Sequence, residues 1–281
     1  MTMREFELQI AAGCIRGLRN GGNGPKVLAL HGWLDNAASF VPLAPYLGDI
    51  DLVAVDLPGH GRSDHLPPGV EYTFPGALHN VLDIADALGW ERFALLGHSM
   101  GAGIASLVAA ACPQRVERLV AIEALGALPE TAERTTARLR ESVSATRALR
   151  GKALRVFVDP QPAVRARMHA NALSEPVARL LVERGLADVE GGHTWSSDPR
   201  LTVPTMVRMT DAQVDDLVAG IECPTRVIYA DPPQPYLPEP DRSRRARLLP
   251  QAELVVLPGG HHLHMETPQA VAEAIGRFFH G

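Results

Sequence analysis

Short apolar runs recur along the chain and alternate with longer segments of helical period. Six runs are apolar throughout, which is typical of strands that are covered on both faces of a sheet. They are residues 27–30, 52–55, 93–96, 119–122, 227–229 and 254–257. A helix is expected over 72–88, ending at Gly89, and another is expected to begin after Thr267 and run towards Phe279. The alternation predicts an α/β fold with a mostly parallel central sheet flanked by helices.

Residues 124–221 do not follow this alternation of apolar runs and helical segments. They contain arginine-rich helical segments but no convincing buried strand, and 155–158 is ambiguous. Because loops in compact domains are usually only a few residues long, the interval predicts an inserted subdomain with structure of its own. The remaining residues, 1–123 and 222–281, would form the core. Five prolines within 231–240 predict a stiff loop after the strand at 227–229.

Composition narrows the class of protein. The 281 residues are 46% hydrophobic, and 27 Lys and Arg against 32 Asp and Glu give a net charge of −5, which argues against a nucleic-acid partner. Three cysteines at wide spacing, Cys14, Cys112 and Cys223, favour reduced thiols over a disulfide framework. No apolar run is long enough for a signal peptide or a membrane span, so we expect a soluble, cytoplasmic protein.

The strongest chemical signal follows the run at 93–96. Residues 97–101 read Gly-His-Ser-Met-Gly and lead into a segment of small residues with helical character. A serine with a glycine two residues to either side suits a strained strand-to-helix turn that projects the hydroxyl at the edge of the sheet. This pattern predicts that Ser99 is a nucleophile. The alternative is a solvent-facing serine in a glycine turn.

Together with four other segments, this turn resembles the α/β-hydrolases and, among them, the serine hydrolase-like proteins. The segments are HGWLDN at 31–36, DLPGHGRS at 56–63, GHHLHMETP at 260–268, and GGHTW at 191–195 with DPR at 198–200. The resemblance covers nearly the whole chain. It implies the α/β-hydrolase fold, with an eight-stranded sheet and a helical cap.

A serine hydroxyl needs a base, normally a histidine from elsewhere in the chain. The resemblance implies His261, because Glu266 and Pro268 then fall in register with the family pattern, and His262 is the main competitor. The alternative use of this segment is a metal cluster of His261, His262, His264 and Glu266, but its spacing matches no zinc motif.

The acid that orients the base has two candidates. Many relatives place an aspartate shortly after the strand that follows the cap, but Pro233 stands there, and Asp231 comes two residues early. Another solution known in the superfamily places the acid after the strand that precedes the cap, where Glu123 stands. A carboxylate that ends a buried strand needs a partner, and a histidine would supply one. We therefore favour Glu123 and keep Asp231 as the alternative acid.

The oxyanion donors implied by the resemblance are the backbone N–H groups of Trp33 and Met100. The alternative for Trp33 is a plain core aromatic. Near the site, His31 and His98 are expected to be architectural, and Arg62 is expected to be structural.

These residues predict a serine hydrolase that cleaves a small-molecule carboxylic ester or thioester through an acyl-enzyme, without a cofactor or metal ion. Serine at position 99 disfavours haloalkane dehalogenase and epoxide hydrolase chemistry, which needs a carboxylate nucleophile. Carbon–carbon bond hydrolysis, lyase or perhydrolase chemistry and a non-catalytic binding protein remain alternatives. The natural substrate, its chain length and the oligomeric state stay open. Eight apolar residues of the insertion are expected either to line an acyl pocket or to pack the cap: Leu125, Leu128, Leu139, Val143, Phe157, Met168, Trp195 and Met206.

Overall fold

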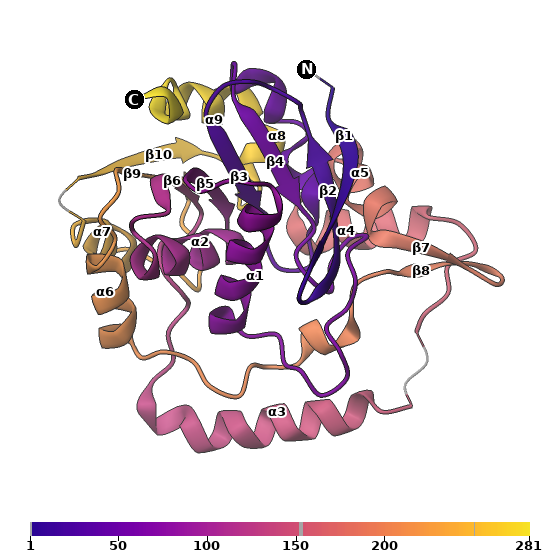
Figure 1. The fold of residues 1–281 in the computed structure, drawn as a ribbon. Coiled ribbons are helices and arrows are strands. Elements are labelled where there is room, and N and C mark those ends of the chain that lie inside the picture. Colours follow the sequence, from indigo (N-terminus) through magenta and orange to yellow (C-terminus); the bar gives the residue numbers. More distant parts are fainter. Residues whose placement is uncertain (1, 152–153, 250) are drawn as a thin grey trace.

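A computed structural model describes residues 2–151, 154–249 and 251–281 (Figure 1). Its centre is an eight-stranded sheet in the order β1-β2-β4-β3-β5-β6-β9-β10. In this order, the last six strands, which begin with β4, run parallel to one another. β1 pairs with β2, and β2 with β4, in antiparallel fashion. The strands are β1 (Arg4–Ile10), β2 (Gly13–Arg19), β3 (Lys26–Leu30), β4 (Asp51–Val55), β5 (Phe93–His98), β6 (Val116–Ile122), β9 (Thr225–Asp231) and β10 (Ala252–Pro258). The predicted α/β fold and eight-stranded sheet are confirmed.

All six apolar runs lie in strands, but the hairpin of β1 and β2 was not expected. In β1 the apolar residues Phe6, Leu8 and Ile10 alternate with polar ones, and the polar residues at positions 5, 7 and 9 are exposed. Such alternation belongs to an antiparallel strand with one solvated face. β1 therefore contains no continuous apolar run, which is why the sequence did not predict it.

Helices cover both faces of the sheet. Leu28 and Leu30 of β3 point into the core beneath α1, α2 and α6, whereas Val27 and Ala29 point into the core beneath η1, η2 and α9. Figure 1 shows α1 and α2 side by side on one face and α9 on the other. Burial on both faces explains why the runs in β3, β4, β5, β6 and β9 are apolar throughout. The expectation is wrong for the run at 254–257, because β10 lies at the edge of the sheet and exposes Leu254 and Val256. The helices of these layers are α1 (Phe74–Ala87), α2 (Met100–Ala111), α6 (Asp211–Ala219), α7 (Asp241–Ala246), α8 (Leu263–Glu266) and α9 (Pro268–Ile275), with 3₁₀ turns η1 (Ala37–Phe40), η2 (Ala44–Tyr46) and η5 (Phe278–His280).

The chain between β6 and β9 is mainly helical. Before α6 it forms η3 (Ala132–Arg134), α3 (Thr135–Leu149), α4 (Gln161–Asn171), α5 (Glu175–Gly185), β7 (Leu186–Val189), β8 (Gly192–Trp195) and η4 (Pro199–Thr202). The β7–β8 hairpin was not expected, and Phe157 from the ambiguous run pairs with His193 beside it. α3 lies apart from the other helices in Figure 1, while α6 buries Val214 and Val218 in the core under the sheet. The division into a core and a cap stays a prediction.

Buried polar contacts hold the insertion against the sheet. The Arg184 Nε of α5 donates to both carboxylate oxygens of Asp56, at 2.9 and 3.0 Å, and Asp56 also accepts the Ala37 and Arg62 N–H groups. The segment at 56–63 is thus a structural turn that receives a side chain from the insertion. Within the described ranges, no helix has both the length and the apolar character needed to cross a membrane.

Candidate active site

Ser99 stands between the end of β5 and the start of α2 with a φ of 51° and a ψ of −116°, a backbone conformation that is strained for a residue with a side chain. The flanking glycines make this turn sterically feasible. A Cβ on Gly97 would lie 2.4 Å from the Ala102 Cα, and a Cβ on Gly101 would lie 1.9 Å from the carbonyl oxygen of Leu30. Neither position has room for a side chain, which explains the spacing of the two glycines around the serine.

Glu123 and His261 are brought together although they lie 138 residues apart. The Glu123 Oε2 is 3.0 Å from the His261 Nδ1, and the Glu123 Oε1 accepts the Ala230 N–H at 2.6 Å. Glu123 also has a positive φ of 62°, and its own N–H donates to the Ile228 carbonyl. The carboxylate is only 3% exposed, so each of its oxygens has a partner in a buried setting.

The alternative acid, Asp231, is not paired with His261 in the described residues. Asp231 is exposed at the end of β9, and across the described ranges no hydrogen bond or ion pair joins its carboxylate to His261. The structure therefore brings Glu123, and not Asp231, to the imidazole.

Tyr236 lies against His261 near Ser99. Its hydroxyl lies 3.1 Å from Nδ1 and 3.3 Å from Nε2 of His261, and the Ser99 side chain is near enough to lower the pKa of the phenol. No direct hydrogen bond between Ser99 and His261 occurs among the described residues, although Tyr236 lies close to both. Catalytic hydrogen bonds often tighten only when substrate binds. Tyr236 was not among the residues predicted for the site, and its only signal in the sequence is the proline-rich loop that carries it.

Burial and the nearby Glu123 charge raise the pKa of Tyr236 to about 12, and the hydrogen bond with Ser99 acts in the opposite direction. The phenol is therefore neutral at pH 7 and can donate a hydrogen bond.

His31 and His98 form hydrogen bonds to neighbouring loops. The His31 Nε2 accepts the Leu57 N–H at 3.0 Å, and the His98 Nε2 lies 2.8 Å from the His261 carbonyl oxygen. Burial lowers the pKa of each imidazole to about 4, so both are neutral at pH 7. Their contacts match the architectural role expected from the sequence.

His262 faces away from Glu123. Its Nε2 is 3.1 Å from the Asp35 Oδ2, and the His264 Nε2 is 2.6 Å from the Ser39 Oγ. Glu266 instead accepts the Ser174 N–H of the insertion at 2.7 Å. The four residues considered as a metal cluster thus have separate partners.

One group of described residues does bring potential metal ligands together. Asp35, His98 and His262 are buried and offer ligand atoms within 4.8 Å of one another. Burial alone would raise the pKa of Asp35, but His262, His98 and the Arg167 guanidinium hold it well below its usual range. The carboxylate thus already pairs with a permanent cation, Arg167.

The loop that carries Trp33 is held by the insertion. The Trp33 indole Nε1 donates to the Leu201 carbonyl at 2.9 Å, and Arg167 Nη2 donates to the Leu34 carbonyl at 3.1 Å. The Trp33 side chain is 53% exposed, so the core-aromatic alternative is wrong. The Met100 N–H is the first of α2, and such N–H groups have no partner inside their own helix.

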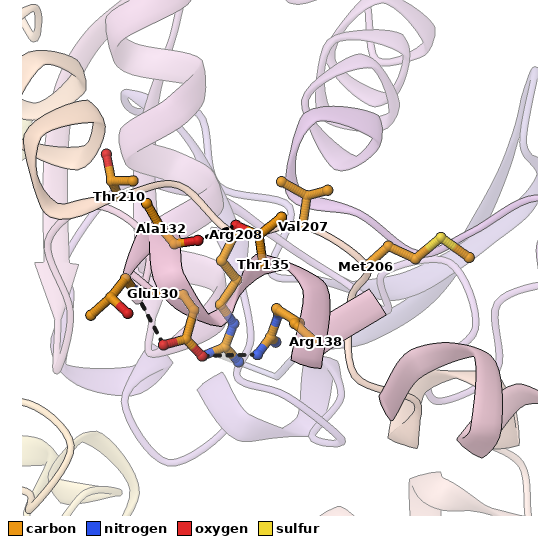
Figure 2. Close-up of a pocket in the computed structure, with 9 residues that line it drawn as sticks. Glu130, Ala132, Thr135, Arg138, Met206, Val207, Arg208 and Thr210 are labelled. Carbon is orange, nitrogen blue, oxygen red and sulfur yellow. Dashed lines mark hydrogen bonds and ion pairs between the residues drawn. The ribbon is translucent and has the colours of Figure 1, made fainter. Parts of the chain in front are cut away.

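Figure 2 shows a pocket elsewhere in the insertion. It is lined by Glu130, Thr131, Ala132, Thr135, Arg138, Met206, Val207, Arg208 and Thr210. The Arg138 Nη1 lies 3.4 Å from the Glu130 Oε2, and burial and the Arg138 charge lower the pKa of Arg208. Ser99, Glu123 and His261 do not line this pocket.

The eight apolar residues of the insertion divide among several environments. Leu125 lies in the core under the sheet, whereas Phe157, Met168 and Trp195 pack in a cluster centred on α4 and α5. Leu139 and Val143 are exposed on α3. Phe157, Met168 and Trp195 therefore pack the insertion, and Leu125 packs against the sheet.

The comparisons with known proteins agree with this fold. A model of the α/β hydrolase fold family matches residues 25–268, so the chain belongs to that family. Within it, the chain is similar to the serine hydrolase-like protein of Danio rerio, with 30% identity over 99% of this chain and 90% of the relative. It is also 32% identical to serine hydrolase-like protein 2 of Homo sapiens, over 91% of this chain and 87% of the relative.

Solved structures give the same result. A hypothetical protein from Pseudomonas aeruginosa PAO1 superposes with a TM-score of 0.92 and 40% identity, covering 98% of this chain and 99% of that one. The thioesterase domain from the curacin biosynthetic pathway gives a TM-score of 0.84 and 27% identity, with coverage of 98% and 99%. Together the relatives support a hydrolase of the α/β family.

Proposed function

We propose that the chain is a serine hydrolase that cleaves a carboxylic ester or thioester through an acyl-enzyme. Ser99 is the nucleophile, His261 the base and Glu123 the acid that orients the base. The observation that carries the proposal is the 3.0 Å contact between the His261 Nδ1 and the buried Glu123 Oε2, on an imidazole that Tyr236 also contacts.

Each role follows from the donors and acceptors present. A carboxylate at Nδ1 keeps the proton on that nitrogen, so Nε2 is free to take the Ser99 proton as Oγ attacks the carbonyl carbon. The oxyanion that forms is stabilised by the N–H groups of Trp33 and Met100, the second of which lies at a helix N-terminus. The leaving group departs with the proton from His261, and water then attacks the acyl-enzyme by the same route.

Labelling with a fluorophosphonate tests the nucleophile. Ser99→Ala is expected to abolish both labelling and ester hydrolysis and to leave thermal unfolding unchanged. Ser144→Ala, on an exposed position of α3, is the matched control and should label like the wild type. Labelling that persists in Ser99→Ala would remove Ser99 from the mechanism.

A panel of p-nitrophenyl esters and acyl-thioesters of graded chain length tests the substrate class. The thioesterase named among the structural relatives supports including thioesters. Hydrolysis of at least one series is expected. If none is turned over, carbon–carbon bond hydrolysis, lyase or perhydrolase chemistry, or a binding role, becomes the better explanation.

A further inference from the structure

Tyr236 contacts two residues of the proposed site, and the acyl-transfer steps above do not use it. Its hydroxyl lies against the imidazole at nearly equal distances from the two nitrogens, 3.1 and 3.3 Å, and also reaches the Ser99 side chain. The phenyl ring meets the imidazole edge-on, with ring centroids 5.9 Å apart and an interplanar angle of 86°. This orientation directs the polar end of the side chain at the reacting groups.

The loop that carries Tyr236 is held in place although the side chain is half exposed. The next residue, Leu237, is 4% exposed in the core, and its N–H donates to the Gln234 carbonyl at 3.0 Å. Further along, the Arg242 Nη1 donates to the Ala230 carbonyl at 2.6 Å and the guanidinium lies over the Tyr229 ring. Five prolines between 232 and 240 further restrict the backbone. The position of the phenol is therefore set by the fold.

In the tetrahedral intermediate, the Ser99 oxygen and the leaving atom are bonded to the same carbon, and the leaving atom must approach the His261 Nε2 to receive its proton. A hydroxyl within reach of both Oγ and Nε2 is thus also within reach of the leaving atom. We infer that Tyr236 is a further catalytic residue, whose hydroxyl donates a hydrogen bond to the leaving-group atom as its bond to the acyl carbon breaks. This inference rests on the proposed acyl-transfer function.

The step balances without further reactants. The bond between the acyl carbon and the leaving atom breaks, its electron pair stays on the leaving atom, and the proton comes from the His261 Nε2. Tyr236 keeps its own proton throughout. Because the hydrogen bond strengthens with the charge that develops on the leaving atom, it matters most for strongly basic leaving groups.

Tyr236→Phe tests the role with a series of acetate esters whose leaving groups increase in basicity: p-nitrophenyl, phenyl and ethyl acetate. The measured quantity is kcat/KM, which reports the steps up to acyl-enzyme formation. The variant should change kcat/KM for the p-nitrophenyl ester less than about twofold, and lower it for the phenyl and ethyl esters by about tenfold or more, as expected for the loss of a hydrogen bond to a charged oxygen. The exposed Tyr46→Phe is the matched control and should leave the whole series unchanged.

A loss of equal size across the series would overturn the inference, because it would indicate a structural role. Unchanged rates would also overturn it. A gain in activity would do the same, since it would mean that the phenol obstructs the site. If the wild-type protein neither hydrolyses an ester nor labels with fluorophosphonate, the proposed function fails and this inference with it. If the wild type does both and only the leaving-group dependence is unaltered, this inference alone fails.

Discussion

Replacing Glu123 by glutamine separates the two candidate acids with almost no change in shape. The two Glu123 oxygens have different partners: Oε1 accepts the Ala230 N–H at 2.6 Å, and Oε2 faces the His261 Nδ1 at 3.0 Å. A glutamine has one oxygen and one NH₂ group, so it can satisfy only one of these two donors.

The geometry decides which of the two interactions survives. If the amide oxygen faced His261, its NH₂ group would meet the Ala230 N–H, leaving a buried donor unsatisfied at a cost of about 1–3 kcal/mol. We therefore expect the NH₂ group to face the Nδ1 of His261. That nitrogen must then accept, the ring proton moves to Nε2, and the imidazole can no longer take the Ser99 proton.

The expected loss of kcat in Glu123→Gln is large. In serine proteases the corresponding change from carboxylate to amide leaves the geometry intact and lowers kcat about 10⁴-fold, equivalent to about 5 kcal/mol. Asp231→Asn should change kcat less than about twofold, because among the described residues no hydrogen bond or ion pair joins the exposed Asp231 carboxylate to His261.

Steady-state hydrolysis of p-nitrophenyl acetate at pH 8 measures both variants, with thermal unfolding as the check that each one folds. A loss of less than about tenfold for Glu123→Gln in a folded protein would refute the tautomer argument. A larger loss for Asp231→Asn than for Glu123→Gln would transfer the role of the acid to Asp231.

Two further predictions concern stability. His31 and His98 are buried, and their pKa values of about 4 lie below the unfolded value of about 6.5. Between these two pKa values, the unfolded state therefore binds more protons than the folded state. The urea midpoint of unfolding should fall as the pH is lowered from 6.5 to 4.5. A constant midpoint would show that the two imidazoles are not held neutral. Gly101→Ala places a methyl group 1.9 Å from a carbonyl oxygen of β3. The variant should therefore lose several kcal/mol of stability or fail to accumulate as soluble protein. An unchanged melting temperature would contradict the close approach.

Continuous apolar runs predicted most of the strands, because a strand that is buried on both faces must itself be apolar. Strands buried on both faces are apolar at nearly every position, which reveals β3 to β6 and β9, whereas β1, with one exposed face, carries only a weak alternation. The β7–β8 hairpin escaped for the same reason, since three residues of β7 are exposed. The edge strand β10, like β3 to β6 and β9, contains a continuous apolar run, although Leu254 and Val256 are exposed.

The candidate site divides in the same way. Ser99 and its two glycines form one turn that a five-residue pattern predicts, although the lack of space at Gly101 comes from Leu30 of the neighbouring strand β3. His261 could be predicted as the base because Glu266 and Pro268, in the same segment, fall in register with the family pattern.

The partners of His261 were decided only by the tertiary structure. β6 pairs with β9 so that Ile122 lies opposite Ile228, and this register carries the next residue, Glu123, to the Ala230 N–H and the imidazole. Tyr236 reaches the same imidazole from a loop that β9 positions. No spacing in the chain encodes these contacts, because they depend on which strands lie side by side and in what register. The sequence by itself therefore determined six of the eight strands of the sheet and the serine turn, and tertiary packing brought the acid and the tyrosine to the histidine.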